Sequence, residues 1–369
     1  MKENDILELS MILPCLNEEK SIGLCLKEIS EVIEKNSLKA EVLVIDNSSN
    51  DKTIEEARKY QNKIKNLRII IEEKQGYGNS CLSGFNNANG KILFIADADY
   101  TYNFSEITKF IKEMRKGAEM VVGNRFSNGM KKESMSWHHR YIGNPFLSFL
   151  VKLFFKVKIN DIHCGARAIR KESFKKLTLY TSGMEFASEM IIKAAKAGLK
   201  IKEIPIDYRP RIGESKLNSI SDGWRHLRFI LLYSPFYLFL LPGIILFLLG
   251  VLPLGIFYIT EPKILGLQFY IHPMFLFAIM TITGYQLIIF SGFAKIYAIT
   301  HLGEKDIMIE KMFKKITLEN TSIVGIILAT LGIIIYILIF LFLNYIIILI
   351  LKLFIHYRLL QKLFLFFFF

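Results

Sequence analysis

Cysteine is scarce in this sequence, and its few copies are not arranged for metal binding. The 369 residues include four cysteines, Cys15, Cys25, Cys81 and Cys164, and no two of them have CxxC spacing. This argues against a zinc ribbon and against a disulfide-stabilised secreted domain, so we expect four reduced thiols in a cytosolic setting. The first residues are acidic and polar, and we therefore expect no signal peptide.

Acidic residues are outnumbered. The sequence has 34 of them against 47 lysines and arginines, which gives a formal net charge of +13. Such an excess suits a protein that lies on anionic lipid and handles anionic substrates. Nucleic acid is the rival interpretation of this charge. It is disfavoured because a membrane protein needs basic residues for its orientation in any case.

Charged residues are nearly absent from three long stretches in the second half of the chain. Residues 231–260, 271–300 and 321–345 each hold an apolar run long enough to cross a bilayer. Residues 346–369 are apolar but contain charges, and predict either a fourth span or an interfacial helix. We therefore expect a soluble domain over 1–217, an interfacial juxtamembrane helix over 218–230 and a multi-pass membrane domain over 231–369.

The loop charges predict an orientation. The loop over 295–320 carries five lysines, whereas the loop over 261–272 carries one. By the positive-inside rule, the first loop and the large N-terminal domain lie in the cytoplasm. Residues 145–155 are apolar but too short to span, and residues 218–230 contain Trp224 beside basic residues. Both segments predict helices in the headgroup layer on that side.

The first hundred residues alternate between apolar runs and helical patterns. Strands are expected at 9–13, 41–45, 67–71 and 92–96, with helices at about 17–36, about 52–60 and up to about 88. This alternation predicts an α/β fold with a mostly parallel, doubly wound sheet. In such sheets ligands bind beyond the carboxyl ends of the strands. Three polar segments, at 14–18, 46–51 and 97–99, are expected to meet at that edge.

The sequence ADADYT, at 96–101, places two carboxylates at the end of the fourth strand. Asp97 and Asp99 point to the same side of an extended chain, and their mutual repulsion suggests a divalent cation. One interpretation is a DxDxT phosphohydrolase with Asp97 as nucleophile. That class has this strand first and a later acidic pair such as GDxxxD, and neither feature is found here. The other interpretation is metal-dependent glycosyl transfer.

Nine motifs carry a resemblance to a known family. They are LPCLNEEKSI (13–22), VIDNSSNDKT (44–53), KQGYGNS (74–80), ADAD (96–99), VVGNRF (121–126), HRYIGN (139–144), DIHCGARAIRK (161–171), GMEFASEMIIKA (183–194) and GESKL (213–217). In order and spacing they resemble family 2 glycosyltransferases of the GT-A fold, in the branch of dolichyl- and polyprenyl-phosphate mannose or glucose synthases. The apolar C-terminal part is similar to members of that branch that carry their own membrane anchor.

The resemblance implies a donor site that holds a nucleotide sugar. Asp97 and Asp99 would bind Mg²⁺ or Mn²⁺ together with the diphosphate. Asn17 and Glu18 also suit helix capping, Lys74 also suits a solvated position, and Arg209 competes with Arg211 for one role. Asn47 stands where an acid is usual, which leaves the base open. The implied donor-binding residues are Pro14, Asn17, Glu18, Asp46, Ser48, Lys74, Gly76, Asp97, Arg211 and Lys216.

The resemblance also implies an acceptor site on the membrane side. Arg125, Arg140 and Asn144 match positions that contact a lipid phosphate. Gly165 stands where some relatives have a proposed catalytic base, and a phosphate with a second pKa of about 6 does not need a strong one. His163 is open between a structural and a catalytic role, and Glu185 between a site role and a capping box with Ser182. The implied catalytic residues are Asp99, Arg125, Arg140, Arg167 and Glu185.

The expected activity is inverting transfer of one hexose to a polyprenyl or dolichyl phosphate at the cytoplasmic membrane face. The donor would be of the GDP-mannose or UDP-glucose type. A processive polysaccharide synthase is disfavoured because no QxxRW motif precedes the first span. The alternative from another class is a membrane scaffold or flippase partner that binds nucleotide without turnover. A homo-oligomer is compatible with the resemblance.

Overall fold

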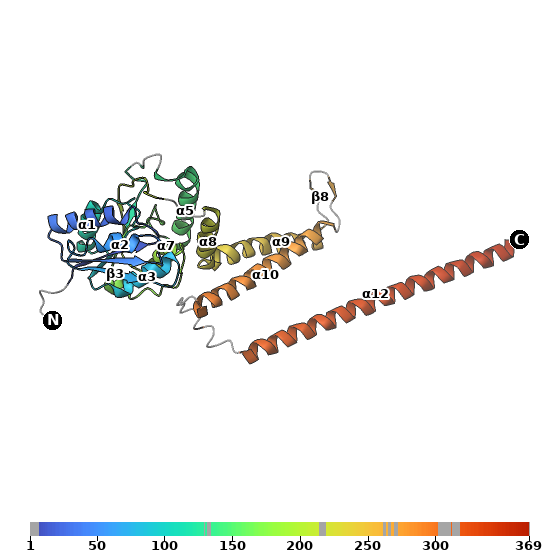
Figure 1. Ribbon diagram of the computed structural model, residues 1–369. Helices are drawn as coiled ribbons and strands as arrows, with labels where there is room; N and C mark the ends of the chain where they lie inside the picture. Colours follow the sequence, from blue (N-terminus) through green and yellow to red (C-terminus); the bar gives the residue numbers. More distant parts are fainter. Residues whose placement is uncertain are drawn as a thin grey trace. The chain divides into compact units, whose positions relative to one another are not determined.

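A seven-stranded mixed sheet forms the centre of the N-terminal part (Figure 1). The computed structural model describes residues 7–128, 130, 134–213, 219–260, 263–264, 267–268, 272–301, 311 and 318–368. The strand order is β3-β2-β1-β4-β6-β5-β7. The strands are β1 (Leu9–Cys15), β2 (Ala40–Asp46), β3 (Leu67–Ile71), β4 (Ile92–Ile95), β5 (Met120–Asn124), β6 (Arg167–Arg170) and β7 (Ile201–Pro205).

The four strands predicted from the alternating pattern are confirmed, and they pair in parallel as expected. The sheet differs from the prediction at β6, a short strand that runs antiparallel to both β4 and β5. The carboxyl ends of β1 and β4 lie side by side. After β1 the chain continues to β2 on one side of this pair, and after β4 it continues to β5 on the other side. This is the switch point where open α/β sheets bind ligands.

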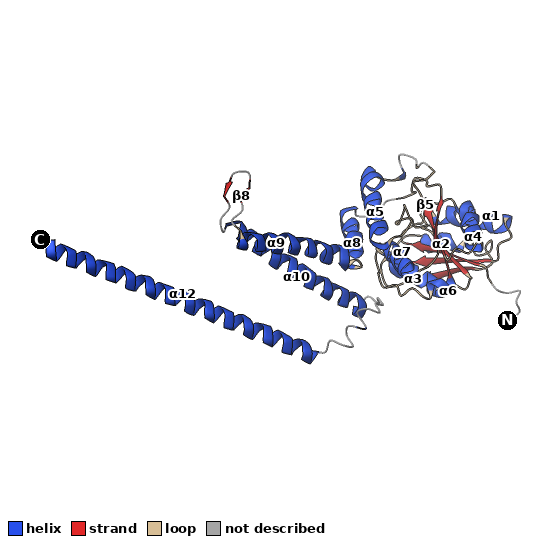
Figure 2. Cartoon of the chain, turned by 180° about the vertical axis from the view of Figure 1, so that it is seen from behind, coloured by secondary structure: helices blue, strands red, loops and turns tan. Residues whose placement is uncertain are grey.

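Helices cover both faces of the sheet (Figure 2). Helices α1 and α4 share one face, whereas the ring of Phe85 in α3 stacks on Phe174 and Phe186 of the opposite face. Helix α1 begins later than predicted, because Asn17 takes a left-handed φ of 51°. The helices are α1 (Ile22–Lys35), α2 (Thr53–Arg58), α3 (Tyr77–Asn87), η2 (Phe104–Glu106), α4 (Ile107–Arg115), η4 (His139–Gly143), α5 (Asn144–Phe155), α6 (Lys171–Phe174) and α7 (Phe186–Lys196).

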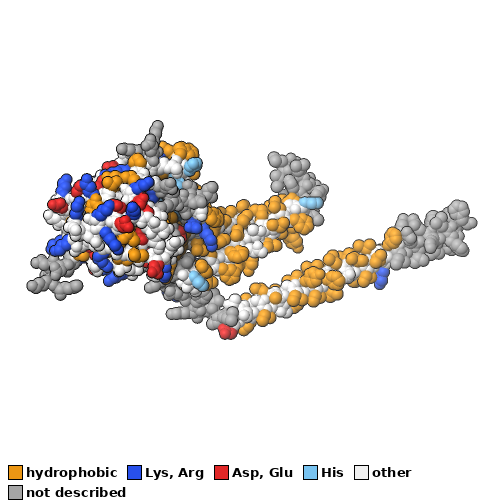
Figure 3. All heavy atoms as spheres, in the orientation of Figure 1, with side chains coloured by type: hydrophobic (Ala, Val, Ile, Leu, Met, Phe, Trp, Pro, Cys, Tyr) orange, Lys and Arg blue, Asp and Glu red, His pale blue; other side chains and the backbone are white. Residues whose placement is uncertain are grey.

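Three helices are long and apolar enough to cross a membrane, over Phe236–Ile259, His272–His301 and Glu319–Phe354 of the described residues. Figure 3 shows their nearly continuous hydrophobic surface. In the first packing unit, Met1–Gly303, the elements after β7 are α8 (Ser219–Leu232), η5 (Phe236–Leu240), α9 (Leu241–Ile259), β8 (Lys263–Ile264), β9 (Leu267–Gln268) and α10 (His272–His301). Helices α9 and α10 approach closely at Gly250 and Gly284, where an added Cβ would overlap the facing helix.

The second unit, Glu304–Phe369, includes the long helix α12 (Leu318–Phe368). This helix is continuous through residues 345 and 346, where the sequence suggested that a third span ends and a separate segment begins. The apolar pattern has no glycine or proline there, so nothing in the chain interrupts the helix. Of the five lysines used to predict the orientation, Lys295 and Lys311 lie among the described residues, and the other three lie outside them.

Candidate functional site

The predicted site residues gather at one edge of the sheet because of strand direction. The parallel strands β1, β2, β4 and β5 end at this edge, and the antiparallel strand β6 begins there. The edge therefore receives Glu18 after β1, Asp46 at the end of β2, Asp97 after β4, Arg125 after β5 and Arg167 at the start of β6.

Asp97 lies in a tight frame made by two neighbours. The hydroxyl of Tyr77, in the first turn of α3, donates to Oδ1 of Asp97 at 3.0 Å. A Cβ added to Gly165 would lie 3.0 Å from Cγ of Asp97, and closer still to Oδ2. Burial and the charge of Asp99 raise the pKa of Asp97 to about 6, although Tyr77, Arg125 and Arg211 oppose the rise. A nearby cation would relieve this repulsion.

Asp99 and Glu18 are joined by one arginine. Nη1 of Arg211 lies 3.2 Å from Oδ2 of Asp99, and Nη2 of the same side chain donates to Oε1 of Glu18. The other oxygen of Asp99 accepts from the backbone and hydroxyl of Thr101, at 3.1 and 2.6 Å. Arg211 therefore links the segment after β1 to the segment after β4.

The segment that carries Arg211 is bound along the acidic segment. The backbone N–H of Ile212 donates to the carbonyl of Asp99, and that of Arg209 donates to the carbonyl of Thr101. The side chain of Arg209 pairs with Glu28 at 2.7 Å, away from the two aspartates. Of the two competing arginines, Arg211 is thus the one at the predicted diphosphate site. Lys216, predicted for the same role, lies outside the described residues.

The loops after β1 and β2 interlock. The backbone N–H of Asn17 donates to the hydroxyl of Ser49, and that of Asn50 donates to Oδ1 of Asn17. Asn17 and Ser48 both have left-handed backbones, with φ of 51° and 64°. Such strained residues cluster at ligand sites. Pro14, by contrast, is a buried member of β1.

The glycine turn before α3 contacts the protein's own backbone. The N–H of Gly78 donates to the carbonyl of Ser182 at 2.8 Å. A Cβ at Gly76 or Gly78 would overlap the backbone of Thr181 and Ser182. The close approach that these glycines permit is therefore to residues 181–182. Lys74, next to this turn, is exposed.

Two buried arginines lie on the other side of the aspartates. Arg125 forms a two-bonded ion pair with the fully buried Asp161, at 2.7 and 2.8 Å, and stacks over Tyr208. Arg167 donates to the carbonyls of Cys164, Ile162 and Ala187. Within the described residues Arg167 forms no ion pair with a carboxylate, and its positive charge opposes the rise in the pKa of Tyr77, the neighbour of Asp97.

A histidine pair next to these arginines includes His226, which the sequence predicted for the headgroup layer and which is instead buried in the protein. His163 and His226 are packed edge to face, 4.3 Å apart, and Nδ1 of His226 lies 2.9 Å from the hydroxyl of Ser188. Burial, the partner ring and the two arginines hold the pKa of His163 well below its usual value. Burial lowers the pKa of His226 to about 4. No motif pointed to His226, because it lies in the juxtamembrane helix.

The two glutamates of the GMEFASEM motif differ in their surroundings. Glu185 immediately precedes α7 but makes no capping hydrogen bond; its carboxylate folds against Gly183, and Oε2 is buried without a partner in the described structure. The predicted capping box with Ser182 is therefore wrong. Glu189 is fully buried, pairs with Lys193 at 2.9 Å and accepts from the backbone of Tyr180 and Thr181.

The remaining predicted acceptor residues lie at the start of α5. Arg140, in the turn η4, lies over the ring of Tyr141, and Asn144 donates to the sulfur of Met135. The same segment exposes Tyr141, Phe146 and Phe149 by more than half of their surface. The end of α5 packs Phe154 on Tyr237, at the beginning of the first candidate span, with the rings 4.6 Å apart.

The donor set fits a divalent cation only together with a ligand that brings oxygens of its own. Asp97 and Asp99 are two residues apart, and the described residues contain no cluster of three histidine, cysteine or acidic side chains. Mg²⁺ is often held by one or two carboxylates plus phosphate oxygens and water. The pair therefore suits a metal that arrives with a diphosphate.

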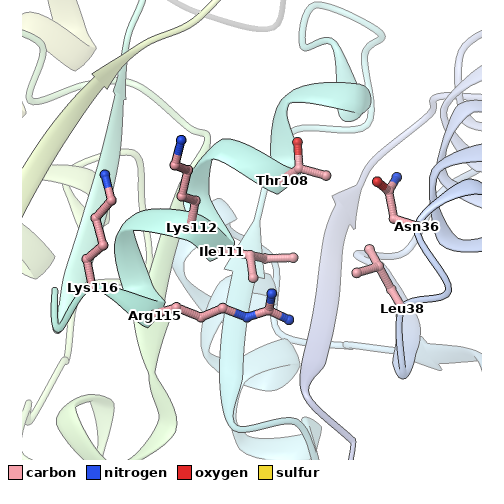
Figure 4. A pocket seen from close by; sticks show the side chains of 7 residues that line it. All are labelled: Asn36, Leu38, Thr108, Ile111, Lys112, Arg115 and Lys116. Carbon is pink, nitrogen blue, oxygen red and sulfur yellow. The ribbon is translucent and has the colours of Figure 1, made fainter.

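An open hollow of about 460 Å³ lies away from these residues (Figure 4). It is bounded by Asn36 and Leu38, between α1 and β2, and by α4. This places it at the opposite edge of the sheet, where the strands β1 and β2 begin. Arg115 in its wall pairs with Glu8 at 2.7 Å. The hollow is therefore not the site at the strand ends.

Comparisons with known proteins identify the family of this chain. A family model described as glycosyl transferase family 2 matches residues 10–178. A Haloferax volcanii protein named low-salt glycan biosynthesis hexosyltransferase Agl6 is 36% identical over 327 residues, which cover 88% of this chain and 77% of that protein. A dolichyl-phosphate hexose transferase of the same organism is 30% identical over 223 residues, 60% of this chain and 92% of that protein.

Two further comparisons concern an archaeal enzyme and a solved structure. A dolichol-phosphate mannosyltransferase from Pyrococcus furiosus is 27% identical over 227 residues, 60% of this chain and 63% of that protein. The crystal structure of mannosyl-3-phosphoglycerate synthase from Rubrobacter xylanophilus aligns with a TM-score of 0.50 and 18% identity, over 61% of this chain and 73% of that one. This structural likeness supports the predicted GT-A type of α/β fold.

Proposed function

The chain belongs to glycosyl transferase family 2, and we propose that it transfers a hexose from a nucleotide sugar to a dolichyl or polyprenyl phosphate with inversion. The chain is a glycosyltransferase of the dolichyl-phosphate hexose transferase type. The observation that carries the finer proposal is the pairing of Asp97 and Asp99 at the switch point with Arg211 opposite them. The phosphohydrolase alternative is wrong, because the family and the fourth-strand position of Asp97 both exclude it.

On the donor side, Asp97 and Asp99 would hold Mg²⁺ or Mn²⁺ together with the diphosphate, and that ion would supply positive charge for the departing diphosphate. Arg211 turns from Asp99 to the phosphates, and Lys216 joins it. Asp46, Asn17, Glu18, Ser48 and the turn at Gly76 enclose the nucleoside, with Pro14 as a buried support and Lys74 at the rim.

On the acceptor side, three arginines attract the lipid phosphate. Arg140 and Asn144 contact it from the membrane side, and Arg125 is held in place by Asp161. Arg167 contributes a fixed positive charge without a carboxylate partner among the described residues. Glu185, whose buried Oε2 has no partner there, is assigned to the sugar hydroxyls. Such fixed charges stabilise the transition state without reorganising.

The reaction does not need a base at position 165, where the frame around Asp97 leaves no room for a side chain. The second pKa of a phosphate monoester is about 6, so the acceptor is largely dianionic at neutral pH. One of its oxygens attacks the anomeric carbon from the face opposite the diphosphate. The bond from that carbon to the diphosphate oxygen breaks, and its electron pair leaves with the nucleoside diphosphate.

The membrane part brings the lipid to this edge. The contact of Phe154 with Tyr237 ties α5 to the beginning of the first candidate span. The exposed aromatic residues of η4 and α5, together with Trp224 of α8, then lie in the headgroup layer. We propose a multi-pass anchor with the catalytic domain in the cytoplasm, on the charge distribution of the loops. Self-association stays a prediction.

A transfer assay with the full chain tests the proposal. The protein is mixed with Mg²⁺ or Mn²⁺, UDP-glucose or GDP-mannose, and a polyprenyl phosphate, and lipid-linked sugar is measured. Asp97→Ala should abolish the product, whereas Asp207→Asn, a change in an exposed carboxylate, should not. If no donor gives lipid-linked sugar, or if the Asp97 variant is as active as the parent, the proposal fails. Metal-dependent nucleotide binding without turnover would favour the scaffold alternative.

A further inference from the structure

One face of helix α1 supports the segment that carries the two aspartates. The thiol of Cys25 donates to the carbonyl of Ala98, the residue between them, at 3.5 Å. One turn further along the helix, Glu28 accepts from the hydroxyl of Tyr100 at 2.9 Å. The other oxygen of Glu28 accepts from the backbone N–H of Phe104 at 3.3 Å. Residues three apart lie on the same side of a helix, so α1 holds the acidic segment at three points.

Tyr100, directly after Asp99, has a left-handed backbone with a φ of 64°. A residue with a Cβ seldom adopts this conformation, and it persists only where surrounding contacts enforce it. The next residue, Thr101, donates from its backbone and its hydroxyl to one oxygen of Asp99. The left-handed residue therefore belongs to the turn that sets the direction of the Asp99 carboxylate, and the contact of Tyr100 with Glu28 helps to enforce it.

Glu28 has a third partner, which lies nearer the solvent. Arg209 pairs with it at 2.7 Å and lies over the ring of Tyr100, 4.9 Å from its centre. The side chain of Arg209 is 30% exposed and that of Glu28 20%. Ion pairs at such positions contribute little. The effect of Glu28 on the acidic segment therefore depends on its bonds to Tyr100 and Phe104.

We propose that Glu28 is a positioning residue for metal binding: through Tyr100 and the N–H of Phe104 it fixes the turn that aims Asp99 at the cation of the donor diphosphate. This rests on the proposed function. Asp97 has a frame of its own, made by Tyr77 and Gly165. The two aspartates are thus held independently, one from α3 and the other from α1. Loss of Glu28 should misdirect Asp99 and leave the nucleoside contacts at the ends of β1 and β2 in place.

Nucleotide binding to the full chain tests the inference without turnover. Calorimetry measures the affinities for UDP and GDP, with Mn²⁺ and with EDTA, and the nucleotide that binds the parent more tightly is used. The ratio of its two affinities is the gain from the metal. In Glu28→Ala this gain should shrink by about 10-fold, because groups that orient a metal ligand commonly change metal affinity by about 10- to 100-fold.

Tyr100→Phe removes only one of the bonds to Glu28, so the gain from the metal should shrink by about threefold. In both variants the affinity with EDTA should stay at the parental value, a pattern that a merely structural role would not give. Glu28→Gln keeps one acceptor oxygen, and its gain should lie between those of the parent and Glu28→Ala. If Glu28→Ala does not fold, Glu28→Gln and Tyr100→Phe decide.

Glu31→Ala is the matched control, because Glu31 is an exposed carboxylate on the same helix. It should keep the parental gain. The inference is overturned if the variants at 28 and 100 also keep it, or if they weaken binding by the same factor with Mn²⁺ and with EDTA. Metal-dependent binding and lipid transfer by the parent would then still support the proposed function. If the parent binds neither nucleotide, or gains nothing from Mn²⁺, the proposed donor site fails together with the inference.

Discussion

Gly165 packs directly against the carboxyl group of Asp97. A Cβ at this position would lie 3.0 Å from Cγ of Asp97 and 2.9 Å from the hydroxyl of Tyr102. The backbone N–H of Gly165 also donates to that hydroxyl at 2.8 Å, so the segment cannot retreat without losing this bond. The glycine thus sets the place of a predicted metal ligand, at the position where some relatives have a proposed base.

We therefore expect Gly165→Ala to impair hexose transfer strongly. The added methyl group forces Asp97 or the 164–166 backbone to move, and a displacement of about 1 Å can cost about 100-fold in rate. We expect kcat to fall by about that factor in the lipid transfer assay. Gly165→Asp should be no better, because the carboxylate has no space. Gly23→Ala is the control, since an added Cβ there meets only Tyr60 at 3.8 Å. Full activity of Gly165→Ala would show that Asp97 does not need this frame.

Arg211 competes with the metal for Asp99. In Arg211→Gln the ion pair with Asp99 is lost, so Mn²⁺ in the absence of nucleotide should bind about two- to fivefold more tightly, as expected for a partly exposed pair. The same variant should raise the KM for the donor by about tenfold or more, because a charge-assisted bond to the diphosphate is missing. Spin resonance of free Mn²⁺ measures the first effect.

Arg209→Gln is the matched control, because the side chain of Arg209 pairs with Glu28 and, among the described residues, forms no ion pair with either aspartate. It should leave both the affinity for Mn²⁺ and the KM for the donor nearly unchanged. Equal effects of the two substitutions would mean that Arg211 has no special place at the diphosphate.

The sequence predicted the sheet edge with the donor-binding residues well, because short segments of sequence are enough to indicate strands and their ends. Apolar runs followed by polar segments indicated strands and their ends, and parallel order then brought Glu18, Asp46 and Asp97 to one edge. The structure confirms those strands. The start of α1 was misplaced, because the acids at 18 and 19 suggested a first helical turn whereas Asn17 is left-handed.

The acceptor side was harder to predict because its contacts are distant in sequence. Strand β6 has four residues with arginine at both ends, a pattern that indicates no strand by itself. The partner of Arg125 is Asp161, 36 residues away, and His226 meets Ser188 across 38 residues. Such pairs follow from the packing of β5, β6, α7 and α8, which no local pattern encodes.

Glu189 anchors the loop that supports the glycine turn. Its carboxylate is fully buried and holds Lys193, Tyr180 and Thr181, and the next residue of the loop accepts from Gly78. Glu189→Ala leaves a buried lysine unpaired, which typically costs about 3–5 kcal/mol. We expect a clearly lower Tm and a weaker affinity for the donor nucleotide.

The double variant Glu189→Leu with Lys193→Met separates the ion pair from the loop. Replacing a buried pair by apolar groups of similar size is often neutral, so Tm should recover in large part. The donor affinity should stay low, because leucine cannot accept from the loop N–H groups. Recovery of both properties would show that the loop does not depend on Glu189.

The free energy of unfolding should decrease as the pH is lowered, because the pKa values of His163 and His226 are lower in the folded protein than in the unfolded chain. The folded state holds His226 with a pKa of about 4, whereas an unfolded histidine has a pKa of about 6.5. The stabilisation is complete above pH 6.5 and is lost as the pH falls from there toward 4, because protons then favour the unfolded chain. At pH 5 the loss from this one group is about 2 kcal/mol. His163, whose pKa is also lowered, adds to this loss of stability.

Thermal unfolding between pH 7 and 5 tests this prediction. In His226→Asn the Tm should fall less steeply with acid, since asparagine does not titrate and can still bond to Ser188. His138→Asn, at an exposed position, should keep the parental slope. An unchanged slope in His226→Asn would mean that this histidine is already charged in the folded protein.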